Sequence, residues 1–222
     1  VLKMDTSGNL AWARTFGGKH DDFGRSVTAD RDGNVYVAGG FRDTVDFDPG
    51  PGVNTAFSNG DDDIFAQKLS SSGKFLWARS VGGKQSDHAN TIVTDTFGNA
   101  YLSGSFKDTF DFDPGIGVRF LLSAGASDVF TQKLDSGGDF LWAFSIGGNL
   151  DDYGNQLLID PSFDLYLTGD FQGNVDFDPG PGSTNLTSNG NTDVFVQKIT
   201  SKGAFEWVRA VGGVSSDHGH SI

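Results

Sequence analysis

Short runs of alternating hydrophobic and polar residues, separated by turns rich in Gly, Asp and Ser, follow one another along the whole chain. In the middle of the chain this pattern predicts four strands, over residues 91–95, 100–106, 128–135 and 140–148. No stretch has the periodicity and end caps of a helix. The pattern therefore predicts an all-β protein made of short antiparallel strands joined by tight turns.

The four-strand pattern is repeated with a period of 65 residues. Three periods, which start at Ala11, Leu76 and Leu141, align without a gap and share 24 of their 65 positions. Four antiparallel strands per repeat, with glycine-rich turns, are typical of a β-propeller blade. We therefore expect an all-β β-propeller of four-stranded antiparallel blades, with a linear β-array or a sandwich of the same hairpins as the alternative.

The repeat divides the chain into units. Residues 23–83, 88–148 and 153–213 each correspond to a blade, residues 1–22 to the end of a preceding blade with its connection, and residues 214–222 to the start of a further one. This makes about 3.4 blades, whereas closed propellers have about four to eight. We expect an incomplete ring or part of a larger one, in which the open blade edges are pairing surfaces.

One tryptophan marks the last strand of each repeat, and the four are Trp12, Trp77, Trp142 and Trp207. We interpret them as structural repeat positions that form an aromatic layer between blades. A sugar-stacking platform is the alternative.

The order of these residues resembles the bacterial β-propeller repeat family known as SBBP. In the second copy the resemblance is carried by Trp77, Gly82-Gly83, Asp87, Asp95, Gly98-Asn99, Tyr101, Gly104, Asp128, Phe130, Lys133-Leu134, Gly137 and Trp142. The third copy departs from it, with Phe163-Asp164 where the other copies have the Gly-Asn turn. Copies with an added DFDPG hairpin resemble those of large secreted or surface proteins, so the resemblance implies a propeller and an extracellular or cell-surface location in bacteria. It implies no activity.

The chain is strongly acidic, with a formal net charge of −13. This charge disfavours nucleic acid and anionic membranes as partners, because both require clustered Lys and Arg. The chain has no cysteine, which excludes disulfides and thiolate sites. No apolar run approaches the length of a membrane span, so we expect no membrane insertion.

The sequence DFDPG occurs once in each repeat, at residues 46–50, 111–115 and 176–180. Two aspartates two residues apart face the same side of a strand, and Pro-Gly holds the second at a bend. These carboxylates are candidate calcium ligands, since calcium takes six to eight oxygen ligands. The candidates are Asp46, Asp48, Asp111, Asp113, Asp176 and Asp178, with help from Asp63, Asp128 and Asp193. The alternative is turn chemistry, in which Asp48 accepts the amide of Gly50 and Asp46 pairs with Lys68.

Other polar residues have simpler interpretations. If alternate connections of a blade share a face, 20 of the 28 aspartates lie on one rim. Asp30, Asp95 and Asp160 are expected to cap turns. His88 and His218 occupy the position of Phe23 and Tyr153 and are expected to pack as aromatic residues, with His218 and His220 as a less favoured zinc pair.

Three functions are compatible with these features. The first is a non-enzymatic structural or binding module with an acidic, candidate calcium-binding rim and a protein or glycan partner. The second is a structural subunit that self-associates through blade edges. The third is a glycan-acting hydrolase or lyase, which is disfavoured because near-identical repeats offer no unique acid pair. We therefore expect no enzyme.

Overall fold

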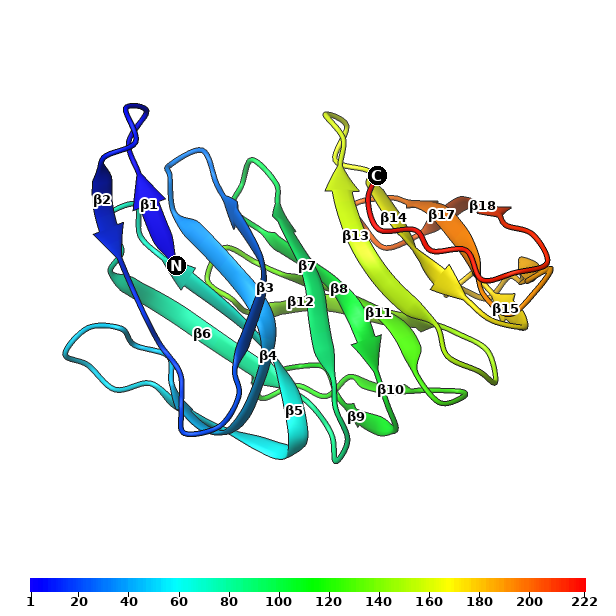
Figure 1. The fold of residues 1–222 in the computed structure, drawn as a ribbon, viewed down its shortest axis with the longest axis horizontal. Helices are drawn as coiled ribbons and strands as arrows, with labels where there is room; N and C mark the ends of the chain where they lie inside the picture. Colours follow the sequence, from blue (N-terminus) through cyan, green and yellow to red (C-terminus); the bar gives the residue numbers. More distant parts are fainter.

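The computed structural model describes residues 1–222 and contains strands but no helix. Three four-stranded antiparallel sheets account for most of the chain (Figure 1). Their strands correspond to the pattern in the sequence: residues 91–95, 100–106, 128–135 and 140–148 match four successive strands of the second sheet within a few residues. The predicted all-β, antiparallel class is confirmed. No helix is present that could cross a membrane.

In each sheet the strands pair in chain order, so the first and fourth strands are the edges. The first sheet contains β3 (Phe23–Ala29), β4 (Val35–Asp46), β5 (Thr55–Leu69) and β6 (Phe75–Val81). The second contains β7 (His88–Thr94), β8 (Ala100–Phe106), β11 (Asp128–Leu134) and β12 (Phe140–Ile146). The third contains β13 (Tyr153–Ile159), β14 (Leu165–Phe171), β17 (Asp193–Ile199) and β18 (Phe205–Val211).

Small hairpins complete the fold. β1 (Leu2–Met4) pairs with β2 (Leu10–Ala13) beside the first sheet. β9 (Thr109–Asp111) pairs with β10 (Phe120–Leu122), and β15 (Asn174–Asp176) pairs with β16 (Asn185–Thr187). These two hairpins lie between the second and third strands of their sheets, and in the first sheet the same hairpin is continuous with β4 and β5.

The hydrophobic core lies between neighbouring sheets. One cluster joins the first and second sheets through side chains such as Tyr36 and Leu102, and another joins the second and third through side chains such as Tyr101 and Leu167. Tyr101 and Leu102 are neighbours on β8, whose seven residues are all buried. Successive side chains of a strand point to opposite faces, so β8 serves both clusters. Burial on both faces agrees with the apolar and small residues of this strand, AYLSGSF.

Tryptophan side chains link each sheet to the next. The indole N–H groups of Trp12, Trp77 and Trp142 donate to the carbonyl oxygens of Ser71, Ser136 and Ser201, at 3.0, 3.1 and 3.3 Å. Each acceptor lies in the turn before the fourth strand of the following sheet. The structure therefore places these indoles between sheets, as the aromatic-layer interpretation predicted.

The turns after the first strands repeat one hydrogen-bonding scheme. The Oδ1 atom of Asp30 accepts the amides of Asp32 and Asn34, and Asp95 and Asp160 bind the equivalent amides. The predicted capping role is confirmed. In the third copy Phe163 occupies the left-handed conformation, with φ of 68°, that glycine occupies in the other two copies, so the turn keeps its shape despite the changed sequence.

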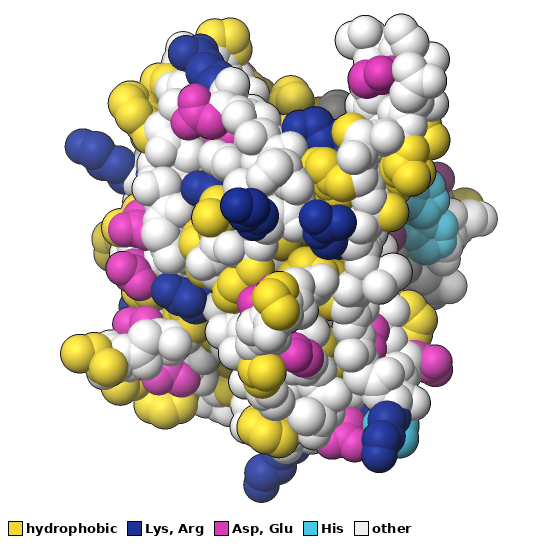
Figure 2. Space-filling model, turned by 90° about the vertical axis from the view of Figure 1, so that its left-hand side faces the viewer, with side chains coloured by type: hydrophobic (Ala, Val, Ile, Leu, Met, Phe, Trp, Pro, Cys, Tyr) yellow, Lys and Arg dark blue, Asp and Glu magenta, His cyan; other side chains and the backbone are white.

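The three sheets stand side by side in chain order, and the array does not close into a ring (Figure 1). The first strands lie next to one another: β7 packs against β3 and β4, and β13 against β7 and β8. Seen from the β1–β2 side, basic, acidic and hydrophobic side chains are mixed, with Lys and Arg spread across the upper half (Figure 2).

Candidate functional site

The phenylalanine of each DFDPG copy anchors the hairpin in the core. Phe47, Phe112 and Phe177 are at most 1% exposed. Phe112 packs edge-on against Phe106, with ring centroids 5.2 Å apart, and its equivalents do the same. A buried glutamine on the third strand donates to the backbone carbonyl of each of these phenylalanines, from Gln67, Gln132 and Gln197. The sequence analysis did not identify these glutamines, although each is invariant among the three repeats.

The DFDPG aspartates bind backbone amides. Asp48 accepts the amide of Gly50 at 2.7 Å, as the turn alternative predicted. Asp46 accepts the amides of Asp48 and Asn54 at 3.0 and 2.8 Å. The second and third copies repeat these bonds. Each carboxylate therefore stabilises the loop that carries it.

Asp46 ends β4, and Asp48 follows it on the other side of the buried Phe47. One detail of the sequence-based interpretation is wrong. Lys68 does not pair with Asp46. Its ammonium lies 4.8 Å from the centre of the Tyr36 ring and donates to the Ser136 carbonyl at 3.0 Å, in the next sheet. That position fits a long amphipathic side chain, whose aliphatic stem is packed while its ammonium group reaches a polar partner in another sheet.

A second set of carboxylates fastens the connections between sheets. Asp87 accepts the amide of Gly83 at 2.8 Å and that of Lys107 at 2.8 Å. Asp22 and Asp152 make the equivalent pairs of bonds. Burial raises the pKa of Asp87 to about 7, opposed by these amides and reinforced by the nearby charge of Asp63. Burial likewise raises the pKa of Asp152 to about 7.

A third carboxylate lies on the third strand of each sheet, at the first residue of β11 and β17 and within β5. Asp63, Asp128 and Asp193 are at most 2% exposed, and the Oδ1 atom of each has no hydrogen-bond partner. A glycine lies directly over each carboxylate: a Cβ atom at Gly147 would lie 2.1 Å from the Asp128 Cγ atom. Burial raises the pKa of both Asp63 and Asp128 to about 6. An unpaired buried oxygen favours the protonated carboxyl group.

The connections between sheets, which carry several acids of the predicted rim, lie against the preceding sheet on its hairpin side. The amides of Asp87, Asp152 and Asp217 donate to the carbonyl oxygens of Asp62, Ser127 and Thr192, each directly before the third-strand aspartate, which brings the inter-sheet connections against the hairpin loops. Isolated bridges from Gly17 to Asp46 and from Gly147 to Asp176 do the same. Several carboxylates in these segments accept backbone amides, so part of their charge is directed into the protein.

The side chains at this rim do not fit a calcium cage. No three His, Asp or Glu side chains of the chain lie together in a group that could hold a metal ion. The DFDPG carboxylates are held by their own loops, and Asp63, Asp128 and Asp193 lie on the third strands, beyond the hairpins. Calcium requires several convergent oxygens, which these residues do not supply.

The histidines make polar contacts in place of simple aromatic packing. His88 Nε2 lies 3.8 Å from Asp62, and burial together with the charge of Arg25 lowers the pKa of His88. His218 Nδ1 lies 3.0 Å from Asp170, and its ring stacks on that of His220 with centroids 6.2 Å apart. The aromatic-packing interpretation is therefore incomplete.

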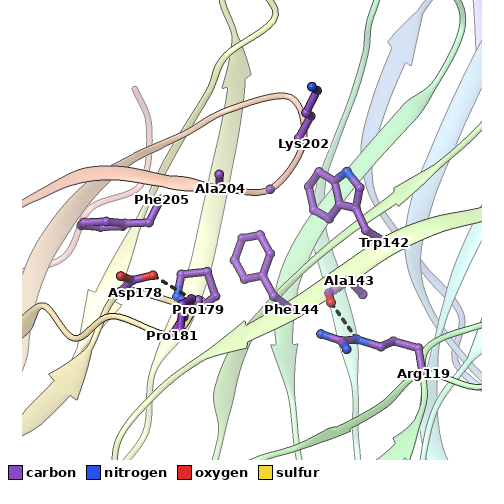
Figure 3. Close-up of a pocket in the computed structure, with 12 residues that line it drawn as sticks. Arg119, Trp142, Ala143, Phe144, Asp178, Pro179, Pro181, Lys202, Ala204 and Phe205 are labelled. Carbon is purple, nitrogen blue, oxygen red and sulfur yellow. Dashed lines mark hydrogen bonds between the residues drawn. The ribbon is translucent and has the colours of Figure 1, made fainter.

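Two cavities of about 410 Å³ each lie between repeats. One is bounded by the turns after the first strands of all three sheets, around Asp30, Asp95 and Asp160. The other lies between the second and third sheets, where Trp142, Phe144 and Phe205 face the DFDPG turn of the third copy (Figure 3). The sequence analysis missed both, because neither follows from one local motif.

Comparison with known protein families finds a match within the chain. Residues 11–39 match the SBBP beta-propeller repeat. The match begins next to Trp12 and reaches into β4, and it supports the repeat family that the sequence resembles.

Two curated proteins are similar to the chain. An uncharacterized WD repeat-containing protein of Acanthamoeba polyphaga mimivirus is 25% identical over 96% of this chain and 17% of its own length. The regulatory protein FlaEY of Caulobacter vibrioides is 30% identical over 60% of this chain and 15% of its own length. The chain thus spans less than a fifth of either relative.

Proposed function

We propose that the three sheets are successive blades of a β-propeller and that the chain is a non-enzymatic binding or structural module of a secreted or cell-surface bacterial protein. The observation that carries this proposal is the repetition of every acidic motif. The amide-bound aspartates of DFDPG and of the inter-sheet connections occur in all three sheets with the same partners. Carboxylates used in this way hold loops in place for binding.

The buried carboxyl groups support the same conclusion. Catalytic acids are often recognised by a raised pKa, and Asp87 and Asp152 both have one. A glycoside hydrolase, however, needs one acid pair that differs from the rest of the fold. Here the raised pKa values recur at equivalent positions 65 residues apart, where both oxygens of each carboxylate already accept amide hydrogens.

Incubation with a panel of acidic and neutral polysaccharides tests the absence of enzymatic activity. We expect no release of reducing ends above a heat-denatured control, together with retention of the chain on at least one glycan or protein array. Release of reducing ends that Asp87→Asn or Asp152→Asn alone abolishes would overturn the proposal. Antibody labelling of intact source cells tests the location, and labelling only after lysis would contradict a surface protein.

Self-association is a second candidate, favoured by the outer face of the third sheet. Val81 and Ile146, on the fourth strands of the first two sheets, are 7% and 2% exposed, whereas the equivalent Val211 is 67% exposed. Arg79 donates to the following sheet at Gly138, while Arg209 at the same position reaches only its own strand. Light scattering at increasing concentration tests this candidate: a mass above the monomer supports it, and a monomer at all concentrations rejects it.

A further inference from the structure

One position breaks the repeat at the boundary between the second and third sheets. Three of the four copies have an arginine two residues after the repeat tryptophan, namely Arg14, Arg79 and Arg209, and the third copy has Phe144. Arg14 and Arg79 donate through Nε to the carbonyl oxygens of Gly73 and Gly138, at 2.8 and 2.9 Å. Phe144 cannot make this bond, so the boundary between the second and third sheets lacks this hydrogen bond.

The residues that face this position also change. Arg79 donates through a second guanidinium nitrogen to Gly137 and Asp139. At the next boundary the equivalent residues are Lys202 and Ala204. The ion pair of Arg79 and Asp139 is thereby replaced by the ring of Phe144 and the methyl group of Ala204. Lys202, which takes the place of Gly137, has no carboxylate partner.

A cavity occupies the space that the arginine fills elsewhere. It has a volume of about 410 Å³, within the range of about 300–1,000 Å³ that ligand sites in proteins take. A small cavity of about 10 Å³ touches Arg79 and Pro114, the counterparts of Phe144 and Pro179, but its other lining residues belong to different positions of the repeat. The exchange of arginine for Phe144 thus coincides with an open site at one boundary.

The walls of the cavity are flat and apolar. The rings of Trp142 and Phe144 are stacked, with centroids 5.6 Å apart and planes 15° apart. Phe205 and the prolines of the DFDPGPG turn, Pro179 and Pro181, complete the apolar lining (Figure 3). The Trp142 N–H is already bound to Ser201, so Trp142 contributes apolar ring atoms to the lining and no free donor.

Two cations lie at the ends of this apolar lining. Arg119 donates through Nε to the carbonyl of Ala143 at 3.0 Å, which holds its guanidinium at one end and leaves its terminal nitrogens without a protein acceptor. Lys202 lies at the other end, beside Trp142 (Figure 3). The carboxylate of Asp178 accepts the amide of Gly180 and so belongs to its own turn. In a chain of net charge −13, this site is cationic and aromatic.

We propose that this cavity binds an acidic saccharide, with a sugar ring against Trp142 and Phe144 and a uronate carboxylate on Arg119. An aromatic face pairs with the apolar face of a flat ring, and a guanidinium binds a carboxylate through two parallel hydrogen bonds. Lys202 receives the carboxylate of a neighbouring sugar unit. This assignment deepens the binding role proposed above and rests on it.

Isothermal titration calorimetry with a galacturonic acid trisaccharide tests the assignment. We expect binding to the wild-type chain, and a loss of about tenfold or more in affinity for the fully methyl-esterified trisaccharide, which lacks the charge. Phe144→Arg restores the residue of the other copies and fills the cavity, so we expect it to abolish binding. Arg119→Asn, with the residue of the first copy, is expected to weaken binding about tenfold.

The control is Arg209→Ala, which changes the same repeat position outside the cavity and should leave affinity unchanged. Equal binding by Phe144→Arg, or no binding of the acidic trisaccharide by the wild-type chain, would overturn the assignment. Tighter binding of benzoate than of the trisaccharide would overturn it too, because it would identify an aromatic carboxylate as the ligand. Retention of the chain on another glycan or a protein would in each case leave the broader binding function standing.

Discussion

Four glycines at the same place in the repeat allow the packing between sheets to be tested with internal controls. They lie in the turn before the fourth strand, and all have a positive φ, of 82°, 76°, 82° and 79° at Gly8, Gly73, Gly138 and Gly203. What differs is the neighbour that an added Cβ atom would meet. It would lie 2.8 Å from Trp12 at position 73, 2.9 Å from Trp77 at position 138 and 3.4 Å from Trp142 at position 203, and it would meet nothing within 4 Å at position 8.

The cost of each alanine follows from these distances. A left-handed backbone costs a residue with a Cβ atom about 1–2 kcal/mol, and all four variants bear this cost. A contact of 3.4 Å is ordinary van der Waals contact, so Gly203→Ala should cost no more than Gly8→Ala. At positions 73 and 138 the indole must move, and overpacking of this kind adds about 1–3 kcal/mol. The expected losses are therefore about 1–2 kcal/mol for Gly8→Ala and Gly203→Ala, and about 2–5 kcal/mol for Gly73→Ala and Gly138→Ala.

Urea unfolding followed by tryptophan fluorescence measures these losses, provided that the slope m is unchanged. Ser72→Ala, at an exposed residue beside Gly73, is the control for a surface change in the same turn and should stay within about 0.5 kcal/mol of wild type. Equal destabilisation by all four glycine variants would refute the reasoning, because it would mean that the indole rings move aside with no loss of folding free energy. The backbone conformation alone would then set the effect.

Two further predictions concern buried polar groups, and a third concerns metal binding. Gln132→Leu should cost about 1–3 kcal/mol in urea unfolding, because it leaves the buried Phe112 carbonyl unpaired, and an unchanged midpoint would show that water replaces the amide. The free energy of unfolding should fall as pH rises from about 4 to about 7. The raised pKa values of Asp87 and Asp152, about 7 against 3.8 for the ordinary group, mean that the folded state binds more protons in this window, and a stability that rises there would contradict these values. Excess EDTA should leave the melting temperature unchanged, since no side-chain cage is present, and a fall reversed by calcium would restore the calcium interpretation of DFDPG.

The strands and their turns could be predicted from the sequence because both depend on local rules. Alternation places β7, β8, β11 and β12 within a few residues, and Asp30 caps its turn through amides two and four residues away. The Asx turn of Asp48 is equally local. Such contacts are fixed by residue type and spacing within one loop.

The remaining contacts could not be predicted, because they depend on how distant segments meet. The partner of Gln132 is a main-chain carbonyl 20 residues away, which no motif marks. Lys68 was assigned to Asp46, although its ammonium reaches Ser136 in the next sheet. The cavity at Phe144 could be predicted only if the binding partners of the equivalent arginines were known. A comparison of the copies showed the substitution, and only the structure showed its consequence.

The contacts between sheets all join one copy to the next. Trp12 binds Ser71, Tyr36 binds Gly98, Asn90 binds Gly154 and the Ile92 amide binds Ser26, at sequence separations of 59, 62, 64 and 66. Because stability in such an array is a sum of unit and nearest-neighbour terms, a mutation at one boundary leaves the others untouched. Substitutions at each boundary can therefore change ligand specificity independently of the others. A tandem array can acquire several different ligand sites while its fold stays the same.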